Sequence, residues 1–184
     1  MTPDELLTME VGRTARRAND VIAATRDLWI RCVGGNARLA PPMGTRDLFE
    51  GCRKLVPTIF EEDIQGEVLD ALREAEQAQK HRGTVVHERW IPAKDSELTW
   101  VAGEKLYKSQ THSQWSLDQL RDISDSLARS NFRLRAAAIL AYEATTPNLR
   151  ERAPRAETLA LLRGQFIVTS DGGARLTRPD LGGE

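Results

Sequence analysis

Apolar residues recur every three or four positions over most of the chain, which is the spacing of one face of an α-helix. The first such segment includes Ile22 and Trp29. Thr2 and Glu5 form a capping box at its start, and two glycines at positions 34 and 35 end the pattern. We therefore expect a long amphipathic helix between these two boundaries.

Two more helices are predicted in the next part of the chain. One begins at Thr45 and is closed by Pro57, and the other begins at a second capping box of Thr58 and Glu61 and runs to about His81. The surface of the second helix is acidic, which makes it a poor candidate for contact with phosphate. Its carboxylates are Glu62, Glu67, Asp70, Glu74 and Glu76.

After Gly83 the apolar pattern changes from helical spacing to alternation. Residues 84–92 alternate as a strand does, and residues 97–101 are suited to pair with them as a hairpin. A helix over residues 96–110 is the alternative interpretation of the second segment.

The C-terminal part of the chain returns to helical spacing. Ser116 and Gln119 form a third capping signal, and a break or kink near residues 130 and 131 separates the predicted helical segments 116–130 and 131–144. A shorter helix follows Pro154 and is capped by Gly164. Residues 165–177 alternate on both sides of an Asp-Gly-Gly turn at 171–173, which predicts a hairpin.

These elements predict a mainly α fold, a helical bundle with a small hairpin near the C-terminus and, where the strand interpretation holds, a second short hairpin in the middle of the chain. The chain divides into an N-terminal helical region, 1–112, and a C-terminal helical region, 113–184, that ends in the hairpin. At 184 residues it is also short enough to form a single compact domain.

Composition limits the classes of protein that this chain can represent. A net charge of −1 argues against a globally basic nucleic-acid binder. No apolar run reaches the ~18 residues that a membrane span needs, and the acidic start is unlike a secretory signal, so we expect a cytoplasmic protein without a membrane partner. Cys32 and Cys52 lie in apolar helical segments, where buried free thiols are expected.

The sequence contains no motif that indicates catalysis. It lacks a glycine-rich phosphate loop, histidine or cysteine pairs at metal spacing, and a nucleophile elbow. His81, His87 and His112 fall in different predicted elements, and His87, beside Glu88, has the pattern of a surface or packed histidine. We therefore predict neither an enzyme nor a cofactor or metal site.

Basic residues are strongly biased towards arginine, with 21 arginines and 5 lysines. Arginine makes forked contacts with phosphate and carboxylate groups, although GC-rich codon usage gives the same bias without any function. The arginines also cluster along the chain, at positions 13, 16 and 17, at 129, 133 and 135, and at 150, 152 and 155.

The predicted helix that contains Arg129, Arg133 and Arg135 needs groups that neutralise these three charges. Arg133 and Arg135 are about 200° apart around a helix, so only Arg133 shares a face with Arg129. Asp125, four residues before Arg129, is placed to pair with it. Arg133 and Arg135 are then left without a partner, and either a carboxylate or a bound phosphate would provide one.

Basic and aromatic residues are interleaved in KLYKSQTHSQW, residues 105–115. Lys105 and Lys108, with Tyr107 and Trp115, make a pattern that nucleic-acid contacts use. Trp115 also fits a hydrophobic staple before the Ser116 cap.

The C-terminal segment, residues 116–178, resembles a winged-helix DNA-binding domain, in which such a hairpin is the wing. In size, helicity and basic helix faces, most of the chain resembles the helical small subunit of a CRISPR effector complex. That resemblance implies a non-catalytic, antiviral-defence subunit that joins other proteins in a ribonucleoprotein complex and contacts the backbone of RNA or DNA with little sequence specificity. The implied nucleic-acid-binding residues, together with those of the interleaved stretch, are Arg13, Arg16, Arg17, Lys105, Lys108, Arg129, Arg133 and Arg135.

A protein-only interaction module is the third hypothesis. In such a module the arginines would pair with carboxylates inside the fold.

Overall fold

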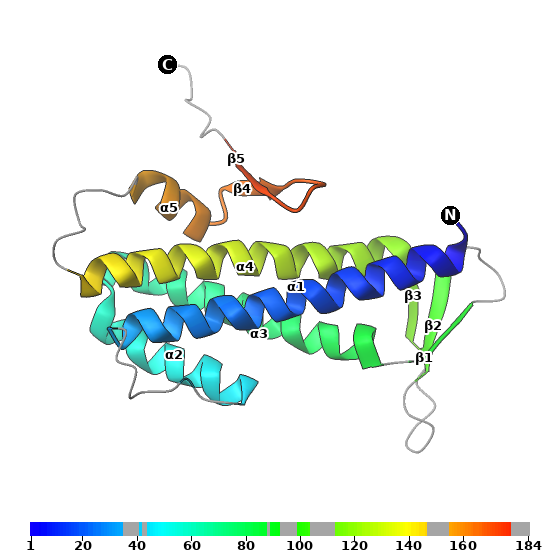
Figure 1. The fold of residues 1–184 in the computed structure, drawn as a ribbon, viewed down its shortest axis with the longest axis horizontal. Coiled ribbons are helices and arrows are strands. Elements are labelled where there is room, and N and C mark those ends of the chain that lie inside the picture. Colours follow the sequence, from blue (N-terminus) through cyan, green and yellow to red (C-terminus); the bar gives the residue numbers. More distant parts are fainter. Residues whose placement is uncertain are drawn as a thin grey trace.

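The computed structural model describes residues 1–34, 41, 44–87, 89–92, 99–103, 113–146 and 155–177. Two long helices, α1 (Pro3–Cys32) and α4 (Leu117–Thr145), lie side by side and run in the same direction (Figure 1). A third, α3 (Glu62–His87), packs against both and runs the opposite way, and α2 (Thr45–Ile59) covers one end of the bundle. The predicted mainly α bundle is confirmed.

Two small antiparallel sheets flank the bundle. β1 (Arg89–Pro92), β2 (Thr99–Gly103) and β3 (Ser113–Ser116) form one sheet in that order, at the end where α1 and α4 begin (Figure 1). The two predicted hairpins are confirmed, and pairing of β3 with β2 adds a strand that the sequence pattern did not indicate.

The C-terminal elements lie on the outer side of α4. They are α5 (Arg155–Leu162) and the hairpin of β4 (Phe166–Val168) and β5 (Ala174–Leu176). Phe166 is buried and packs edge-to-face on Phe132 of α4, with ring centroids 5.7 Å apart, so the hairpin is attached to the bundle by an aromatic contact.

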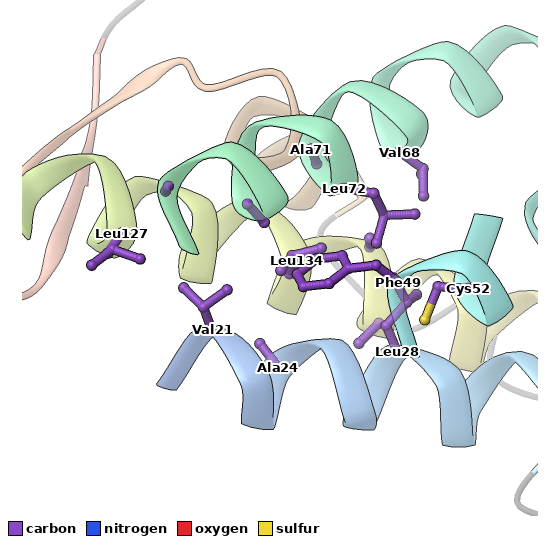
Figure 2. Close-up of a cluster of buried hydrophobic side chains, with 14 of the residues drawn as sticks. Val21, Ala24, Leu28, Phe49, Cys52, Val68, Ala71, Leu72, Leu127 and Leu134 are labelled. Carbon is purple, nitrogen blue, oxygen red and sulfur yellow. The ribbon is translucent and has the colours of Figure 1, made fainter. Parts of the chain in front are cut away.

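The core is continuous across the N-terminal and C-terminal regions. Val21 and Leu28 of α1, Phe49 of α2, Leu72 of α3 and Leu134 of α4 are each at most 1% exposed and lie in one cluster (Figure 2). Because helices from both halves of the chain bury their apolar stripes against each other, neither half keeps its core without the other.

Several predicted helix boundaries are confirmed. The capping boxes of Thr2 with Glu5 and of Ser116 with Gln119 are both formed. Gly34, Gly164 and Gly172 have positive φ values of 67°, 73° and 86°, where glycine avoids the steric cost that other residues meet.

Four predicted boundaries were wrong. Pro57 lies inside α2, and the hydroxyl of Thr58 bonds to the Leu55 carbonyl in that helix instead of capping α3. Of the break or kink predicted near residues 130 and 131, the break is absent, because α4 is one continuous helix from Leu117 to Thr145. Residues 84–87 belong to α3 and not to a strand.

No helix among the described residues is both long enough and apolar enough to span a membrane.

Candidate nucleic-acid interface

Arg17 points from α1 into the contact with α4. Its guanidinium donates to the Asp125 carboxylate at 2.6 Å and to the Ser124 hydroxyl at 3.1 Å, and its side chain is 10% exposed. The sequence-based pairing of Asp125 with Arg129 is therefore corrected, since Asp125 pairs with Arg17. This arginine joins two helices that are more than 100 residues apart in sequence.

Among the predicted site residues that the structure describes, Arg133 is the most enclosed. It is 7% exposed, donates to the Leu162 carbonyl at 2.6 Å and the Glu67 carbonyl at 3.3 Å, and forms an ion pair with Glu74. The partner that the sequence left unidentified thus comes from the acidic helix α3 and from the end of α5. All three groups must be given up before this guanidinium can meet a phosphate.

Arg13 is also engaged by a carboxylate. It lies 3.0 Å from Glu10, whose side chain is completely buried, and Arg121 of α4 approaches the same carboxylate at 3.6 Å. Burying a carboxylate is costly unless cations and hydrogen bonds compensate it, so Arg13 and Arg121 stabilise Glu10 in the fold.

Arg16 and Arg135 lie on the opposite, solvent-facing side of the same two helices. Both are exposed, and neither forms an ion pair with a carboxylate of the described residues. Arg135 donates to the side-chain oxygen of Asn131 at 3.2 Å, and Arg16 and Asn131 line one surface hollow between α1, α4 and the β4–β5 turn. Asn131 is thus the residue that both predicted arginines have near them, and Arg135 does not itself line the hollow.

Arg129 is exposed and lies over the ring of Phe166, with its guanidinium carbon 5.7 Å from the ring centroid. It therefore helps to hold the C-terminal hairpin on α4.

The basic and aromatic stretch 105–115 is described only in part. Lys105 and Lys108 lie outside the described residues. Trp115 is in β3, opposite Trp100 of β2, and packs against the core. Its position immediately before the Ser116 cap agrees with a packing role in this part of the structure.

A basic group that sequence reasoning missed lies at the C-terminal end of α3. One guanidinium nitrogen of Arg82 lies 3.5 Å from Nε2 of His87. The Nε atom of Arg82 is buried and has no hydrogen-bond partner, and no carboxylate of the described residues forms an ion pair with this arginine. Lys80 and His81 precede it on the same helix.

The missed signal was the sequence HRGTVVH, residues 81–87. Gly83 and the β-branched residues after it favour a strand, so His87 was assigned to a different element from Arg82. Burial of Val85 and the hydrogen bond from Trp90 to its carbonyl (3.0 Å) accompany one more turn of helix. That additional turn of helix brings the imidazole of His87 close to the guanidinium of Arg82.

The two cysteines and a possible metal-binding cluster are the other groups to examine for a chemical role. Burial raises the pKa of Cys32 and of Cys52 to about 12, so both thiols stay protonated and unreactive near neutral pH. Within the described part of the chain, no group of three or more histidine, cysteine, aspartate or glutamate side chains is placed to hold a metal ion.

No protein-family model, no curated protein and no solved structure matches this chain. The resemblances to a CRISPR small subunit and to a winged-helix domain, and the contacts that they imply, therefore stay predictions.

Proposed function

We propose that this protein binds the phosphate groups of a nucleic acid, and that Arg82 and His87 at the end of α3 bind one of these phosphates. The observation that supports this proposal is the environment of the Arg82 guanidinium. It touches an imidazole, it has a buried nitrogen without a partner, and no described carboxylate neutralises it. Arginine in such a state is well suited to a forked contact with phosphate oxygens.

The other candidate arginines are less suited to bind a phosphate than Arg82 is. Arg17 and Arg133 already donate to carboxylates and carbonyls inside the bundle. A phosphate would have to displace these partners, and the new contact would be offset by loss of the hydrogen bonds and ion pairs that hold each guanidinium in the bundle. The expected class of ligand is thus the one that the sequence indicates, whereas the site lies on a different helix.

Binding should depend on salt and not on base sequence, because a phosphate contact carries no information about the base. We would measure binding of the purified protein to labelled single-stranded RNA, single-stranded DNA and duplex DNA over a salt series. Arg82→Gln should weaken binding and reduce the slope of log K against log salt by about 0.7 on a single strand. His87→Gln should weaken binding less.

Arg73→Gln is the matched control, because Arg73 lies on the same helix, is exposed and pairs with Asp70 at 3.0 Å. Circular dichroism of each variant checks that α3 is intact. Equal binding by the Arg82 and Arg73 variants would overturn the proposed site. If the parent protein binds none of the three nucleic acids at low salt, a protein-only interaction module becomes the better account.

Cleavage of RNA is a second candidate function, favoured by the contact between the His87 imidazole and the Arg82 guanidinium. Histidine commonly transfers protons in catalysis, and arginine stabilises negative charge on phosphate oxygens. In this reaction His87 takes the proton of a 2′-hydroxyl, whose oxygen bonds to the adjacent phosphorus. The bond from phosphorus to the 5′-oxygen breaks, that oxygen takes a proton from water, and the hydroxide so formed takes the proton that His87 holds, which restores the neutral imidazole.

The products would be a 2′,3′-cyclic phosphate and a free 5′-hydroxyl, and DNA of the same sequence would stay intact because it lacks the nucleophile. A denaturing gel of end-labelled RNA and DNA tests this directly. Cleavage of RNA that disappears in His87→Gln supports the second candidate. Binding without cleavage by the parent protein leaves only the first.

A further inference from the structure

We infer that a small pocket at the end of the bundle where α4 ends and α3 begins (Figure 1) binds the ammonium group of a primary alkylamine. We call it the Glu143 pocket. It is defined by Ile59 and Phe60 at the end of α2, Ile64 of α3, and Leu140 and Glu143 of α4. Neither these residues nor this ligand belongs to the proposed function, so the pocket and the phosphate site are tested independently.

The first observation is a carboxylate oxygen without a partner. Oε1 of Glu143 is buried and has no hydrogen-bond partner, and no basic side chain of the described residues forms an ion pair with this residue. Arg31 lies over the ring of the neighbouring Tyr142 and pairs with Asp27 instead. A charged oxygen withdrawn from water is costly unless a cation or a hydrogen-bond donor compensates it. An ammonium group supplies both.

The second observation is the direction of the helices around the pocket. α2 and α4 both end here, at Ile59 and Thr145, and neither has a basic residue in its last turn. The C-terminal end of a helix carries partial negative charge and favours a cation. α3 begins here with the opposite polarity, but Glu62 and Asp63 in its first turn compensate its positive end. The charge around the pocket therefore favours a cationic ligand.

The third observation is the size and lining of the pocket. Its volume is about 60 Å³, and Phe60, Ile64 and Leu140 in its wall are at most 5% exposed. An apolar cavity of about 150 Å³ holds one benzene molecule, so this pocket holds roughly two or three heavy atoms. Glu143 and Ala144 are half-buried, so the pocket opens to solvent on their side. An ammonium nitrogen with the first carbons of its alkyl stem fits this space, and the rest of the stem extends outwards.

Other cations fit the Glu143 pocket less well. Mg²⁺ and Ca²⁺ take about six or more oxygen ligands, and among the described residues no group of three or more metal-binding side chains is placed to hold an ion. A guanidinium group is wider than this space and prefers both oxygens of a carboxylate. Glu61 also lines the pocket but has another interaction in the fold, so Glu143 is the proposed acceptor.

A free alkylamine and a lysine side chain both end in this ammonium group. Two probes separate these sources. One is n-propylamine, and the other is N-acetyl-lysine methylamide, which presents the same group beside a peptide backbone. Both are charged at neutral pH. The control ligand is 1-propanol, which has nearly the same shape as n-propylamine and no charge.

The experiment is an NMR titration, at constant ionic strength, of protein labelled at its isoleucine and leucine methyl groups. Both amines should cause saturable shifts at Ile59, Ile64 and Leu140, which line the pocket. Ile167 of β4, which is not part of the pocket, should not shift. The affinity for 1-propanol should be at least about tenfold lower, because it lacks the charge that Glu143 receives.

Three variants test the residues of the pocket. Glu143→Gln should weaken binding of both amines at least about tenfold, through loss of a charge-assisted hydrogen bond, and should fold at least as well as the parent because a buried unpartnered charge is removed. Ala144→Leu should block binding by filling the space. Asp122→Asn removes an exposed carboxylate from the same helix and should bind as the parent does. Circular dichroism and thermal unfolding check the fold of each variant.

Saturable shifts that both pocket variants abolish would support the inference, and the tighter of the two amines would identify the source of the ammonium group. Equal binding of 1-propanol and n-propylamine would show an apolar pocket without recognition of charge and would overturn the inference. Absence of shifts with both amines, or an unchanged affinity in Glu143→Gln, would also overturn it. None of these results bears on nucleic-acid binding by Arg82→Gln, so the proposed function stands or fails separately.

Discussion

The inner and outer faces of α1 and α4 use the same side chain for different purposes. Arg17 and Arg133 point inwards and donate to carboxylates, a hydroxyl and carbonyls, whereas Arg16 and Arg135, one and two residues away, are exposed and form no ion pair with a carboxylate of the described residues. A difference of one or two positions around a helix thus separates an arginine that stabilises the fold from one that is free to meet a ligand.

Several carboxylates of α3 are also engaged by arginines of the fold. Much of the acidic surface predicted for α3 is used inside the protein, because Glu67, Glu74 and Glu76 pair with Arg163, Arg133 and Arg53. Overall neutrality therefore coexists with local groups of uncompensated arginines. A net charge near zero is a poor guide to whether one face of a protein can bind phosphate.

The largest expected effect comes from breaking the inner face at Arg133. Arg133→Met should lower the free energy of unfolding by about 2–4 kcal/mol, because the buried Leu162 carbonyl and the half-buried Glu67 carbonyl lose their side-chain donor and Glu74 loses its cation. Urea denaturation measures the change. Arg135→Met is the matched control on the outer face and should stay within about 0.5 kcal/mol of the parent. Equal losses for the two variants would contradict the distinction between the faces.

A smaller effect is expected at Arg17. Arg17→Gln should lower the free energy of unfolding by about 1–2 kcal/mol, since the lost partner Asp125 is itself 58% exposed and is rehydrated when the pair is removed. Thermal unfolding of this variant beside Arg16→Gln gives the comparison one residue apart. An unchanged Arg17→Gln protein would mean that the pair is replaced by solvent at no cost.

The smallest effect concerns Asp171, the acid that shares a hollow with Arg16. Hydrogen bonds from the Thr169 hydroxyl and then from the Gly173 amide lower the pKa of this carboxyl. Because the folded pKa lies below the unfolded one, the stabilisation is present above the unfolded pKa and is lost as the pH falls through the folded pKa. A carboxyl NMR titration should show the pKa rising in Thr169→Val and staying unchanged in Arg16→Gln. A rise in Arg16→Gln instead would mean that Asp171 neutralises this outer arginine.

The proposed phosphate site shows why the contact between Arg82 and His87 could not be predicted from the sequence. Local propensity around Gly83 favours the end of the helix, whereas the buried Val85 continues it for another turn. Propensities of this size are below 1 kcal/mol per residue, and burial of a valine side chain exceeds them. The contact between Arg82 and His87 depends on that turn.

The sequence by itself determined the helical class of this protein, the two capping boxes that start α1 and α4, the glycine turns, and the presence of arginine clusters. These features follow from local spacing and backbone preferences, which a single chain segment carries. Only the tertiary structure decided which arginines form ion pairs and hydrogen bonds within the fold. Their partners come from helices that are distant in sequence, and whether a charge is paired depends on which acids the packed helices bring within reach of it.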